Sequence, residues 1–296
     1  MRKVLLALLL VLLAAPPVQA ATSKRTVVYY QTQYSQGSTG TYVSPLPLAG
    51  RATDVLVAAI HLDANSVVHL NDHPPEHSRY TQMWKDLATL QSRGVNVIGM
   101  LGGAAPGSFQ RLQNEFGTYY PLLRDLVRKY HLNGIDLDVE ESVSLASIER
   151  VIDALKTDFG SGFIVTLSPV ASALWGGGNL SGFNYEQLYR DRGSKISWFH
   201  GQFYNGWGSA SSTANYDRII GRGLIPANKV VMATLTNPAN GGSGYVSITT
   251  LRSTVKSAIA KYPTFGGVAG WEYFNSLPGG TAAPWQWASE VTAMQK

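Results

Sequence analysis

The sequence predicts an α/β fold, a single-domain (β/α)8 or TIM barrel, from three observations. Eight short runs rich in Val, Ile and aromatic residues recur about every 35 residues. Segments with apolar residues at helical spacing separate these runs, and no linker-like stretch divides the chain. An open doubly wound sheet would show the same alternation, but neither of its usual glycine-rich nucleotide motifs follows a predicted strand. The barrel is therefore favoured, with the open sheet as the alternative.

The eight runs are predicted to be strands because they are short and rich in β-branched residues. They cover residues 26–30, 54–60, 95–101, 134–140, 163–167, 197–204, 229–235 and 266–273. Apolar spacing near 3.6 predicts amphipathic helices within residues 122–130, 145–155 and 251–262. The first connection, residues 31–53, is rich in Gly, Ser, Thr and Pro and has no helical period. We expect a loop over the site there, or a degenerate first helix.

Residues 1–20 have the composition of a secretory signal peptide. Met-Arg-Lys precedes an apolar stretch from Val4 to Ala15, and the small-residue exit Val18-Gln19-Ala20 follows. The apolar stretch is shorter than the roughly 20 residues that span a bilayer. We therefore expect a secreted, extracellular protein whose barrel comprises residues 21–296, without a membrane anchor after cleavage. Cleavage would lower the formal charge from +5 to +3, because residues 1–20 hold two basic residues and no acid.

The remaining composition excludes several partners. Lys and Arg are scattered singly, so nothing indicates nucleic-acid binding. The chain has no cysteine, so a secreted form would be stabilised by its apolar core without disulfide bonds. Separately, we expect a monomer. Four histidines lie at positions 61, 69, 73 and 77 without metal-ligand spacing, which favours solvated loop residues. No metal site and no cofactor is predicted.

Three acids alternate with aliphatic residues in the fourth predicted strand. Asp136, Asp138 and Glu140 share one face of this strand, and Ile135, Leu137 and Val139 share the other. In a barrel the aliphatic face packs on the helices, so the acids point into the barrel. Neighbouring acids lie about 6.6 Å apart and repel by roughly 2.5 kcal/mol at an effective dielectric of about 20. At least one should hold a proton, and Glu140, nearest the C-terminal rim, is the expected holder.

A protonated carboxyl group at a barrel rim can protonate the leaving oxygen of a glycoside. Two alternatives use the same residues. The strand could be a solvent-exposed edge with its charges facing water. The three acids could instead bind a divalent metal ion.

Residues 133–140, Asn-Gly-Ile-Asp-Leu-Asp-Val-Glu, resemble the Asp-x-x-Asp-x-Asp-x-Glu signature of glycoside hydrolase family 18. This family includes chitinases and endo-β-N-acetylglucosaminidases. Gly102-Gly103, the stretch 202–205 (Gln-Phe-Tyr-Asn) and Trp271 are similar to three further motifs of the family, in the same order. Asn133 and Met100 depart from the family's usual Asp and Ser, which leaves the tuning of Asp136 and Asp138 open.

The resemblance implies a retaining mechanism in which the 2-acetamido oxygen of the substrate attacks the anomeric carbon. Glu140 is implied to be the proton donor, Asp138 to orient the acetamide, Asp136 to share a proton with Asp138, and Tyr204 to donate to the acetamide carbonyl. Trp271 is implied to lie beneath a sugar ring. The other expected substrate-binding residues lie at strand ends: Gln202, Asn205, Tyr30, Trp207, Gly102 and Gly103, with Tyr29 beside them.

The expected partner is an N-acetylglucosamine oligosaccharide, from either an N-glycan or chitin. Residues 202–205 and 242–246 look like plant class III chitinases, which usually carry disulfides that this chain lacks. The longer stretches 180–184 and 270–280 resemble secreted fungal endo-β-N-acetylglucosaminidases more closely. We therefore expect hydrolysis of the β-1,4 linkage in the chitobiose core of N-glycans, with a chitinase as the alternative. A non-catalytic lectin or inhibitor is a second alternative, but such relatives typically lose the acid, and Glu140 is present.

Overall fold

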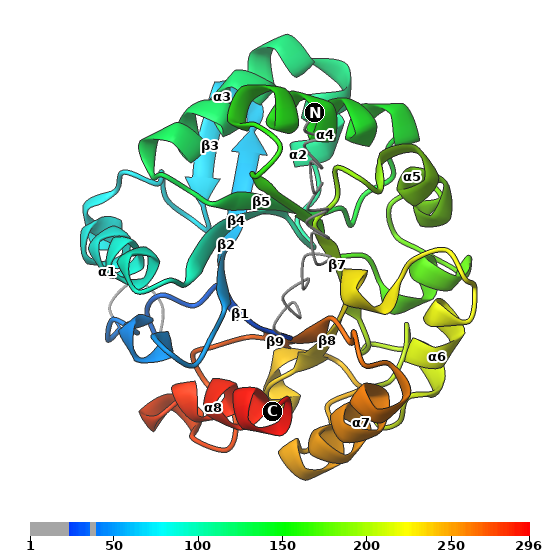
Figure 1. Ribbon diagram of the computed structural model, residues 1–296. Helices are drawn as coiled ribbons and strands as arrows, with labels where there is room; N and C mark the ends of the chain where they lie inside the picture. The colour runs from blue at the N-terminus through cyan, green and yellow to red at the C-terminus, as the bar shows by residue number, and fades with distance from the viewer. Residues whose placement is uncertain (1–23, 36–39) are drawn as a thin grey trace, which may run out of the picture.

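The computed structural model describes residues 24–35 and 40–296, and its strands form a closed barrel surrounded by helices (Figure 1). Neighbouring strands pair in parallel around the ring, and β1 pairs with both β9 and β2, which closes the sheet. The barrel strands are β1 (Arg25–Tyr30), β2 (Asp54–Asp63), β4 (Asn96–Gly102), β5 (Gly134–Asp138), β6 (Ile164–Leu167), β7 (Trp198–Gln202), β8 (Val230–Leu235) and β9 (Gly267–Trp271). The predicted (β/α)8 barrel is confirmed, and the closure rules out the open sheet.

The helices lie outside the barrel (Figure 1). They are α1 (Thr81–Ser92), α2 (Ser108–Asn114), α3 (Phe116–Lys129), α4 (Leu145–Phe159), α5 (Tyr185–Arg192), α6 (Ala214–Ile220), α7 (Ile248–Lys261) and α8 (Trp285–Met294). Ser144, Asn184 and Ser247 cap α4, α5 and α7, because each side chain accepts a backbone N–H of the first turn. The helices predicted within 122–130, 145–155 and 251–262 are confirmed.

The connection from β1 to β2 holds no α-helix in its described residues. Its regular element is a 3-10 turn, Leu46–Leu48, so the expected degenerate first helix is confirmed. A further strand, β3 (Val67–Leu70), was not predicted and pairs antiparallel with β2. The predicted signal peptide, residues 1–20, lies outside the described residues. Among the helices of the described chain, none has the length and apolarity needed to cross a membrane.

Two apolar cores lie on opposite faces of the sheet, because side chains of a strand alternate sides. The outer core packs between strands and helices and includes Ile135, Leu137 and Val139, as predicted. The inner core fills the barrel and includes Tyr29 and Trp198. Full burial of one large aliphatic side chain contributes about 1.5–3 kcal/mol. Placing acids among the inner side chains therefore replaces favourable apolar burial.

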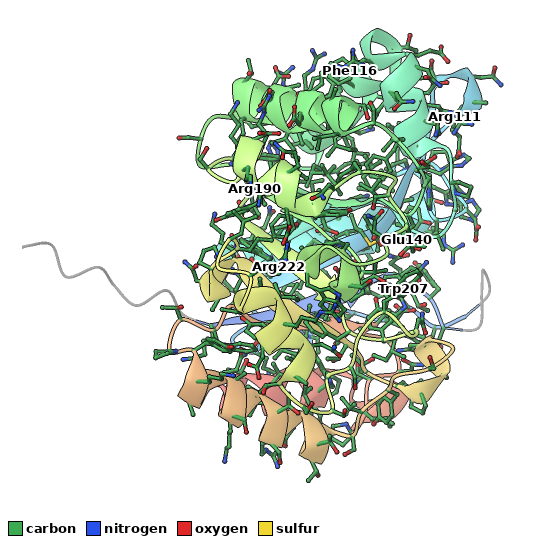
Figure 2. All side chains as sticks on the ribbon, turned by 90° about the vertical axis from the view of Figure 1, so that its right-hand side faces the viewer. Arg111, Phe116, Glu140, Arg190, Trp207 and Arg222 are labelled. Carbon is green, nitrogen blue, oxygen red and sulfur yellow. The ribbon has the colours of Figure 1, made fainter. Side chains whose placement is uncertain are left out.

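The parallel strands bring their carboxyl ends to one end of the barrel, where active sites of this fold lie. Figure 2 shows Glu140 and Trp207 at the same end of the molecule. β5 ends at Asp138, so Glu140 lies two residues beyond the strand that was expected to include it. Glu140 is half-buried there, at the barrel mouth.

Candidate active site

Asp136 lies fully buried inside the barrel, with hydrogen-bond donors on both carboxylate oxygens. Thr166 Oγ1 donates to Oδ1 over 2.6 Å, and Ser168 Oγ donates to Oδ2 over 2.7 Å. Nδ1 of His200 lies 3.1 Å from Oδ1. Since the Ser168 hydroxyl already donates to Asp136, the Tyr29 hydroxyl, 2.7 Å away, donates to Ser168. Both oxygens of Asp136 therefore act as hydrogen-bond acceptors.

Asp138 is the acid whose proton affinity the fold changes most clearly. Burial raises its pKa well above the ordinary value, and the charges of Glu140 and Asp136 raise it further. The sequence led us to expect a proton on Glu140, and the structure adds Asp138 as a second acid that can hold one. Asp138 is 6% exposed and lies between the other two acids, whereas Glu140 lies at the rim. Desolvation and the two neighbouring charges together therefore favour a proton on Asp138.

Gln202, at the end of β7, joins two of the acids. Its side-chain nitrogen lies 3.3 Å from Asp138 Oδ1 and 3.1 Å from Glu140 Oε1. The same nitrogen donates to the backbone oxygen of Ser168 over 2.8 Å, which anchors the amide. Gln202 was predicted to share the inward face of β7, and the structure confirms that position.

Two aromatic side chains complete the inner wall. Burial, followed by the charges of Asp138, Glu140 and Asp136, raises the pKa of the Tyr204 phenol well above its ordinary value. The phenol therefore keeps its proton and can donate it in a hydrogen bond. Trp271 ends β9 half-buried, with its ring centroid 5.4 Å from that of Tyr29 in an edge-to-face arrangement. An indole face at this depth is suited to packing against the apolar face of a sugar.

Tyr30 was predicted to bind substrate, and this prediction is wrong. Tyr30 is fully buried in the outer core, where its hydroxyl donates to the Val43 backbone oxygen over 2.6 Å. Its ring packs against Tyr273, 6.0 Å between centroids. Adjacent residues of a strand face opposite sides, so the inward position belongs to Tyr29.

Asn205 and Trp207 support the rim loops. Asn205 adopts φ 54°, and its side-chain oxygen accepts the backbone N–H groups of Gly242 and Ser243 at 3.0 and 3.1 Å. The backbone of Trp207 bonds to Tyr204 and to Ser172. Both residues lie at the predicted end of the barrel. The side-chain oxygen of Asn205 is occupied by hydrogen bonds to the loop that contains Gly242 and Ser243.

Gly102 and Gly103 allow the end of β4 to cross closely over Asp138. Both adopt φ 94°, a region that favours glycine. A Cβ atom on Gly102 would lie 2.5 Å from the Asp138 backbone oxygen and 2.4 Å from Phe109. The N–H of Gly103 donates to that same oxygen over 2.9 Å. The glycines therefore shape the site through the backbone.

The two departures from the family signature have clear structural positions. The side-chain oxygen of Asn133 accepts the Val97 backbone N–H at 2.8 Å and the Gln91 amide at 2.9 Å, at the start of β5. It is occupied at the opposite end of the strand from the acids. Met100 lies in the inner core and pairs in register with Asp136, so β4 offers a thioether where the family has a hydroxyl. The hydroxyl donors to Asp136 are Thr166 on β6 and Ser168 just after it.

Sequence reasoning missed several polar residues around the site. Trp198 and His200 lie on the inward face of β7, as alternation with Gln202 could have indicated. Glu141 accepts the N–H groups of Gly107 and Phe109 at 2.9 and 2.8 Å and so holds the start of α2. Within residues 24–35 and 40–296, no group of three or more His, Cys, Asp or Glu side chains is arranged to hold a metal ion.

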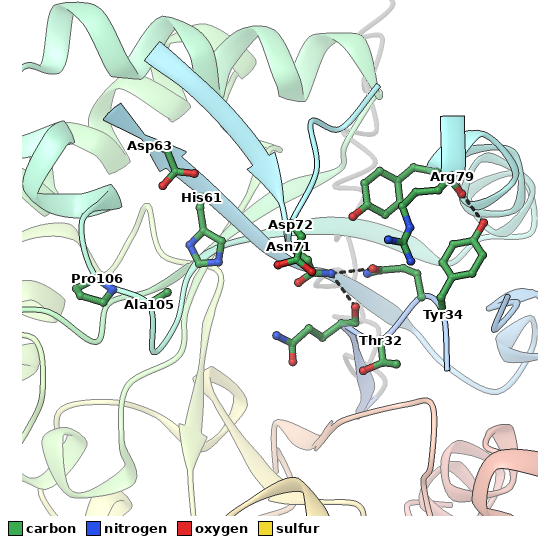
Figure 3. A pocket seen from close by; sticks show the side chains of 12 residues that line it. Thr32, Tyr34, His61, Asp63, Asn71, Asp72, Arg79, Ala105 and Pro106 are labelled. Atoms are coloured by element: carbon green, nitrogen blue, oxygen red, sulfur yellow. Dashed lines mark hydrogen bonds between the residues drawn. The ribbon is translucent and has the colours of Figure 1, made fainter. Parts of the chain in front are cut away.

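A polar pocket of about 590 Å³ lies at the barrel end that also carries Glu140 (Figure 3). Its lining residues come from the ends of β1, β2 and β4 and from the segment after β3: Gln31, Thr32, Gln33, Tyr34, His61, Asp63, Asn71, Asp72, Arg79, Tyr80, Ala105 and Pro106. None of the three acids lines it. Two of its lining residues are linked to residues of the site. Thr32 donates to Glu272, next to Trp271, and Ala105 lies two positions after Gly103. Burial lowers the pKa of the His61 imidazole, which faces this pocket as a neutral group.

The fold and the site together define a (β/α)8-barrel protein with a carboxylate cluster of the glycoside hydrolase kind. A fungal endo-β-N-acetylglucosaminidase from glycosyl hydrolase family 18 is 44% identical, with a TM-score of 0.87, covering 91% of this chain and 97% of that one. The chitinase ChiC from Aspergillus fumigatus is 47% identical, with a TM-score of 0.83, covering 92% of this chain and all of that one. The chain belongs to glycoside hydrolase family 18.

A curated relative, Chitinase 2 from Rhizopus oligosporus, is 29% identical over 283 residues, covering 83% of this chain. The match covers 48% of that protein, so the chain spans about half the length of this curated relative. No family model matches the chain. The resemblance stated from the sequence motifs is confirmed at the level of the family.

Proposed function

We propose that the protein hydrolyses a β-1,4 linkage beside an N-acetylglucosamine by a retaining, substrate-assisted mechanism. The observation that carries this proposal is the joining of Asp138 and Glu140 by the Gln202 amide at the barrel mouth, beside the Tyr204 phenol. This reaction requires three groups: an acid that donates a proton (Glu140), a second acid that can hold a proton (Asp138), and a phenol that donates a hydrogen bond (Tyr204).

In the first step, Glu140 transfers its proton to the glycosidic oxygen as the bond from that oxygen to the anomeric carbon breaks. The acetamide oxygen of the same sugar attacks the anomeric carbon and forms an oxazolinium ion, so the protein supplies no nucleophile. Asp138 orients the acetamide N–H and stabilises the developing positive charge, while Tyr204 donates to the acetamide oxygen before attack. In the second step, water attacks the anomeric carbon while the Glu140 carboxylate takes a proton from it. The bond between this carbon and the acetamide oxygen breaks, and the product retains the β configuration.

For the substrate, we propose the N,N'-diacetylchitobiose core of N-linked glycans, which makes the protein an endo-β-N-acetylglucosaminidase. Likeness to the fungal endo-β-N-acetylglucosaminidase supports this choice. The polar pocket supports it further, because His61, Asp72 and the Gln31 amide can hydrogen-bond to hydroxyl-rich mannose branches. A linear chitin chain has no branch to occupy such a side pocket.

A chitinase is the second candidate, favoured by the comparable identity to the A. fumigatus chitinase. The two activities share the chemistry around Glu140 and differ in what lies beyond the cleaved bond. A non-catalytic lectin or inhibitor is the third candidate, and the presence of Glu140, Asp138 and Tyr204 in one cluster speaks against it.

The test offers the purified protein a high-mannose glycoprotein and, separately, chitin oligomers. A drop in polypeptide mass that leaves one N-acetylglucosamine on asparagine would support the endo-β-N-acetylglucosaminidase. Release of chitobiose from chitin oligomers, without any change in the glycoprotein, would establish the chitinase instead. Binding without turnover of either substrate would support the non-catalytic candidate.

Two pocket variants sharpen the choice of substrate. His61→Ala and Asp72→Ala should lower kcat/KM on the glycoprotein about tenfold, and leave chitotriose cleavage within twofold, because each removes a hydrogen-bonding group from the pocket only. Asp191→Ala is the matched control, since Asp191 pairs with Gln187 on the exposed face of α5. Equal losses on both substrates would contradict a role for the pocket in branch recognition.

We further propose that the protein acts outside the cell as a monomer. The composition of residues 1–20 supports export. Mass determination of the N-terminus of the exported protein tests cleavage after Ala20, and light scattering of the purified protein tests the monomer.

A further inference from the structure

Behind Asp136, two buried aromatic residues of β7 form a hydrogen-bonded line that ends on its carboxylate. Trp198 and His200 are 2% and 0% exposed, and both face the barrel interior. The indole Nε1 of Trp198 donates to Nε2 of His200 over 2.7 Å. On the other side of the imidazole ring, Nδ1 lies 3.1 Å from Asp136 Oδ1.

The line determines which nitrogen of His200 carries a proton. An indole N–H can only donate, so Nε2 of His200 must offer its lone pair to Trp198. The imidazole is then neutral with its hydrogen on Nδ1, which donates to Asp136. A second proton on Nε2 would face the indole N–H directly, so Trp198 opposes formation of an imidazolium ion.

Other groups pack around this line from several strands. The Tyr29 ring, from β1, lies edge-on to His200 at 5.8 Å, and Ser168 Oγ lies 3.4 Å from Nδ1. The Arg25 guanidinium, also from β1, lies 3.5 Å from the centroid of the Trp198 ring, and it faces Asp54 of β2 at 3.8 Å. Among these described neighbours, the acid that contacts His200 directly is Asp136, with Asp138 next along β5.

We propose that Trp198 and His200 are positioning residues that hold Asp136 as a hydrogen-bond acceptor. Through this contact they direct the proton that Asp136 and Asp138 could share onto Asp138. This inference rests on the proposed function, because Asp138 is the residue that must orient the acetamide. Trp198 and His200 precede Gln202 on β7, so they lie deeper in the barrel than the mouth where Glu140 lies. Both act through Asp136, from the interior of the barrel.

Trp198→Phe tests the inference because it removes the indole N–H and keeps an aromatic ring against Arg25. Without the indole donor, the single hydrogen of the neutral imidazole can move to Nε2, and Nδ1 then faces Asp136 as an acceptor. Asp136 loses a donor in that tautomer, so the proton of Asp136 and Asp138 is no longer confined to Asp138. We expect kcat to fall about tenfold, KM to stay within twofold, and the pH profile of kcat to shift. Trp84→Phe is the matched control: its indole N–H donates to the Pro75 backbone oxygen outside the barrel, so only stability should fall.

His200→Phe and His200→Asn separate donation from packing. Phe fills the space without a donor, whereas the Asn amide can still donate from a position close to that of Nδ1. We expect Asn to restore a large part of the kcat that Phe loses. Equal activity of the two variants, or loss of stability in Trp198→Phe with an unchanged pH profile, would overturn the inference.

The inference can also be tested on the unmutated protein, by a measurement that requires neither enzymatic activity nor the correct folding of a variant. Nitrogen-15 correlation spectra of the imidazole should show a hydrogen on Nδ1 and none on Nε2 for His200, as the Trp198 contact requires. A hydrogen on Nε2 would overturn the inference even if the enzyme is active. Absence of turnover on every substrate, with the expected tautomer present, would instead refute the proposed function alone.

Discussion

The side-chain nitrogen of Gln202 donates to Glu140 Oε1 over 3.1 Å and so holds the rim carboxylate from the neighbouring side of the barrel mouth. Because the same nitrogen is anchored on the Ser168 backbone oxygen, the carboxylate cannot turn freely without losing a donor. This relationship and four others lead to testable predictions.

Gln202→Glu replaces this donor with an acceptor of the same shape. We expect kcat/KM to fall about 100- to 1,000-fold, because a preorganised donor is lost and a further charge is placed beside Asp138 and Glu140. Steady-state kinetics on the active substrate measures the loss. Gln187→Glu also places a carboxylate beside an acid, Asp191, but on the outer face of α5, and it should keep full activity. Activity of the Gln202 variant within twofold of the unmutated protein would contradict the bridging role.

Glu140→Gln should abolish hydrolysis, by about 1,000-fold or more, while oligosaccharide binding remains measurable by calorimetry. The neighbouring Glu141→Gln should behave in the opposite way. It weakens the two backbone hydrogen bonds at the start of α2, so thermal stability should fall while turnover is largely kept. Substantial turnover by the Glu140 variant would remove the assignment of the proton donor.

Asp138→Asn should raise the melting temperature at neutral pH. Burial raises the pKa of Asp138 in the folded protein, so the folded state keeps a proton that the unfolded chain releases above about pH 4. The free energy of unfolding therefore falls as pH rises through this window, and the Asn variant removes that loss. Each kcal/mol gained corresponds to about 2–4 °C.

The gain should vanish near about pH 3, where both states of Asp138 are protonated. Asp125→Asn is the control of opposite sign, because a hydrogen bond from Arg124 lowers the pKa of that exposed carboxylate. A melting temperature for Asp138→Asn that is lower than that of the unmutated protein at pH 7 would contradict the raised pKa.

Tyr30→Phe should leave KM and kcat unchanged and lower stability by about 1 kcal/mol, since it removes a buried hydrogen bond to Val43. Tyr29→Phe should instead lower kcat, because the Tyr29 hydroxyl supports Ser168 and through it Asp136. Chemical denaturation and kinetics on both variants measure the two effects. A raised KM for Tyr30→Phe would restore the original prediction of substrate contact.

Gly102→Ala should destabilise the protein by more than about 2 kcal/mol, because its Cβ would clash with the Asp138 backbone oxygen and with Phe109. Gly50→Ala is the matched control. Gly50 also has a positive φ, of 70°, but a Cβ there meets nothing within 4 Å, so backbone strain alone should cost about 1 kcal/mol. Equal losses in the two variants would show that the close approach at Asp138 is unimportant.

Much of the fold followed from features that lie within one segment of chain. The acids of residues 136–140 alternate with aliphatic residues, and a strand has a period of two, so their common inward face could be predicted. In residues 26–30 the same alternation shows that Tyr29 and Tyr30 face opposite sides of the sheet, but not which of them faces the barrel interior. The packing of Tyr30 in the outer core shows that Tyr29 is the inward residue. The short strand β3 was missed because its residues, Val67–Leu70, are recognisable as a strand only against β2.

By itself, the sequence determined the barrel, the acid cluster and the family, because strand period, helix period and motif spacing are local properties. Only the tertiary structure decided how deeply each acid is buried and which residues support it. Asp136 and His200 are 64 positions apart, and their contact depends on how β5 and β7 face each other across the barrel. Desolvation depends on all the atoms around a carboxyl group. The raised pKa of Asp138 is therefore a property of the closed barrel rather than of residues 133–140.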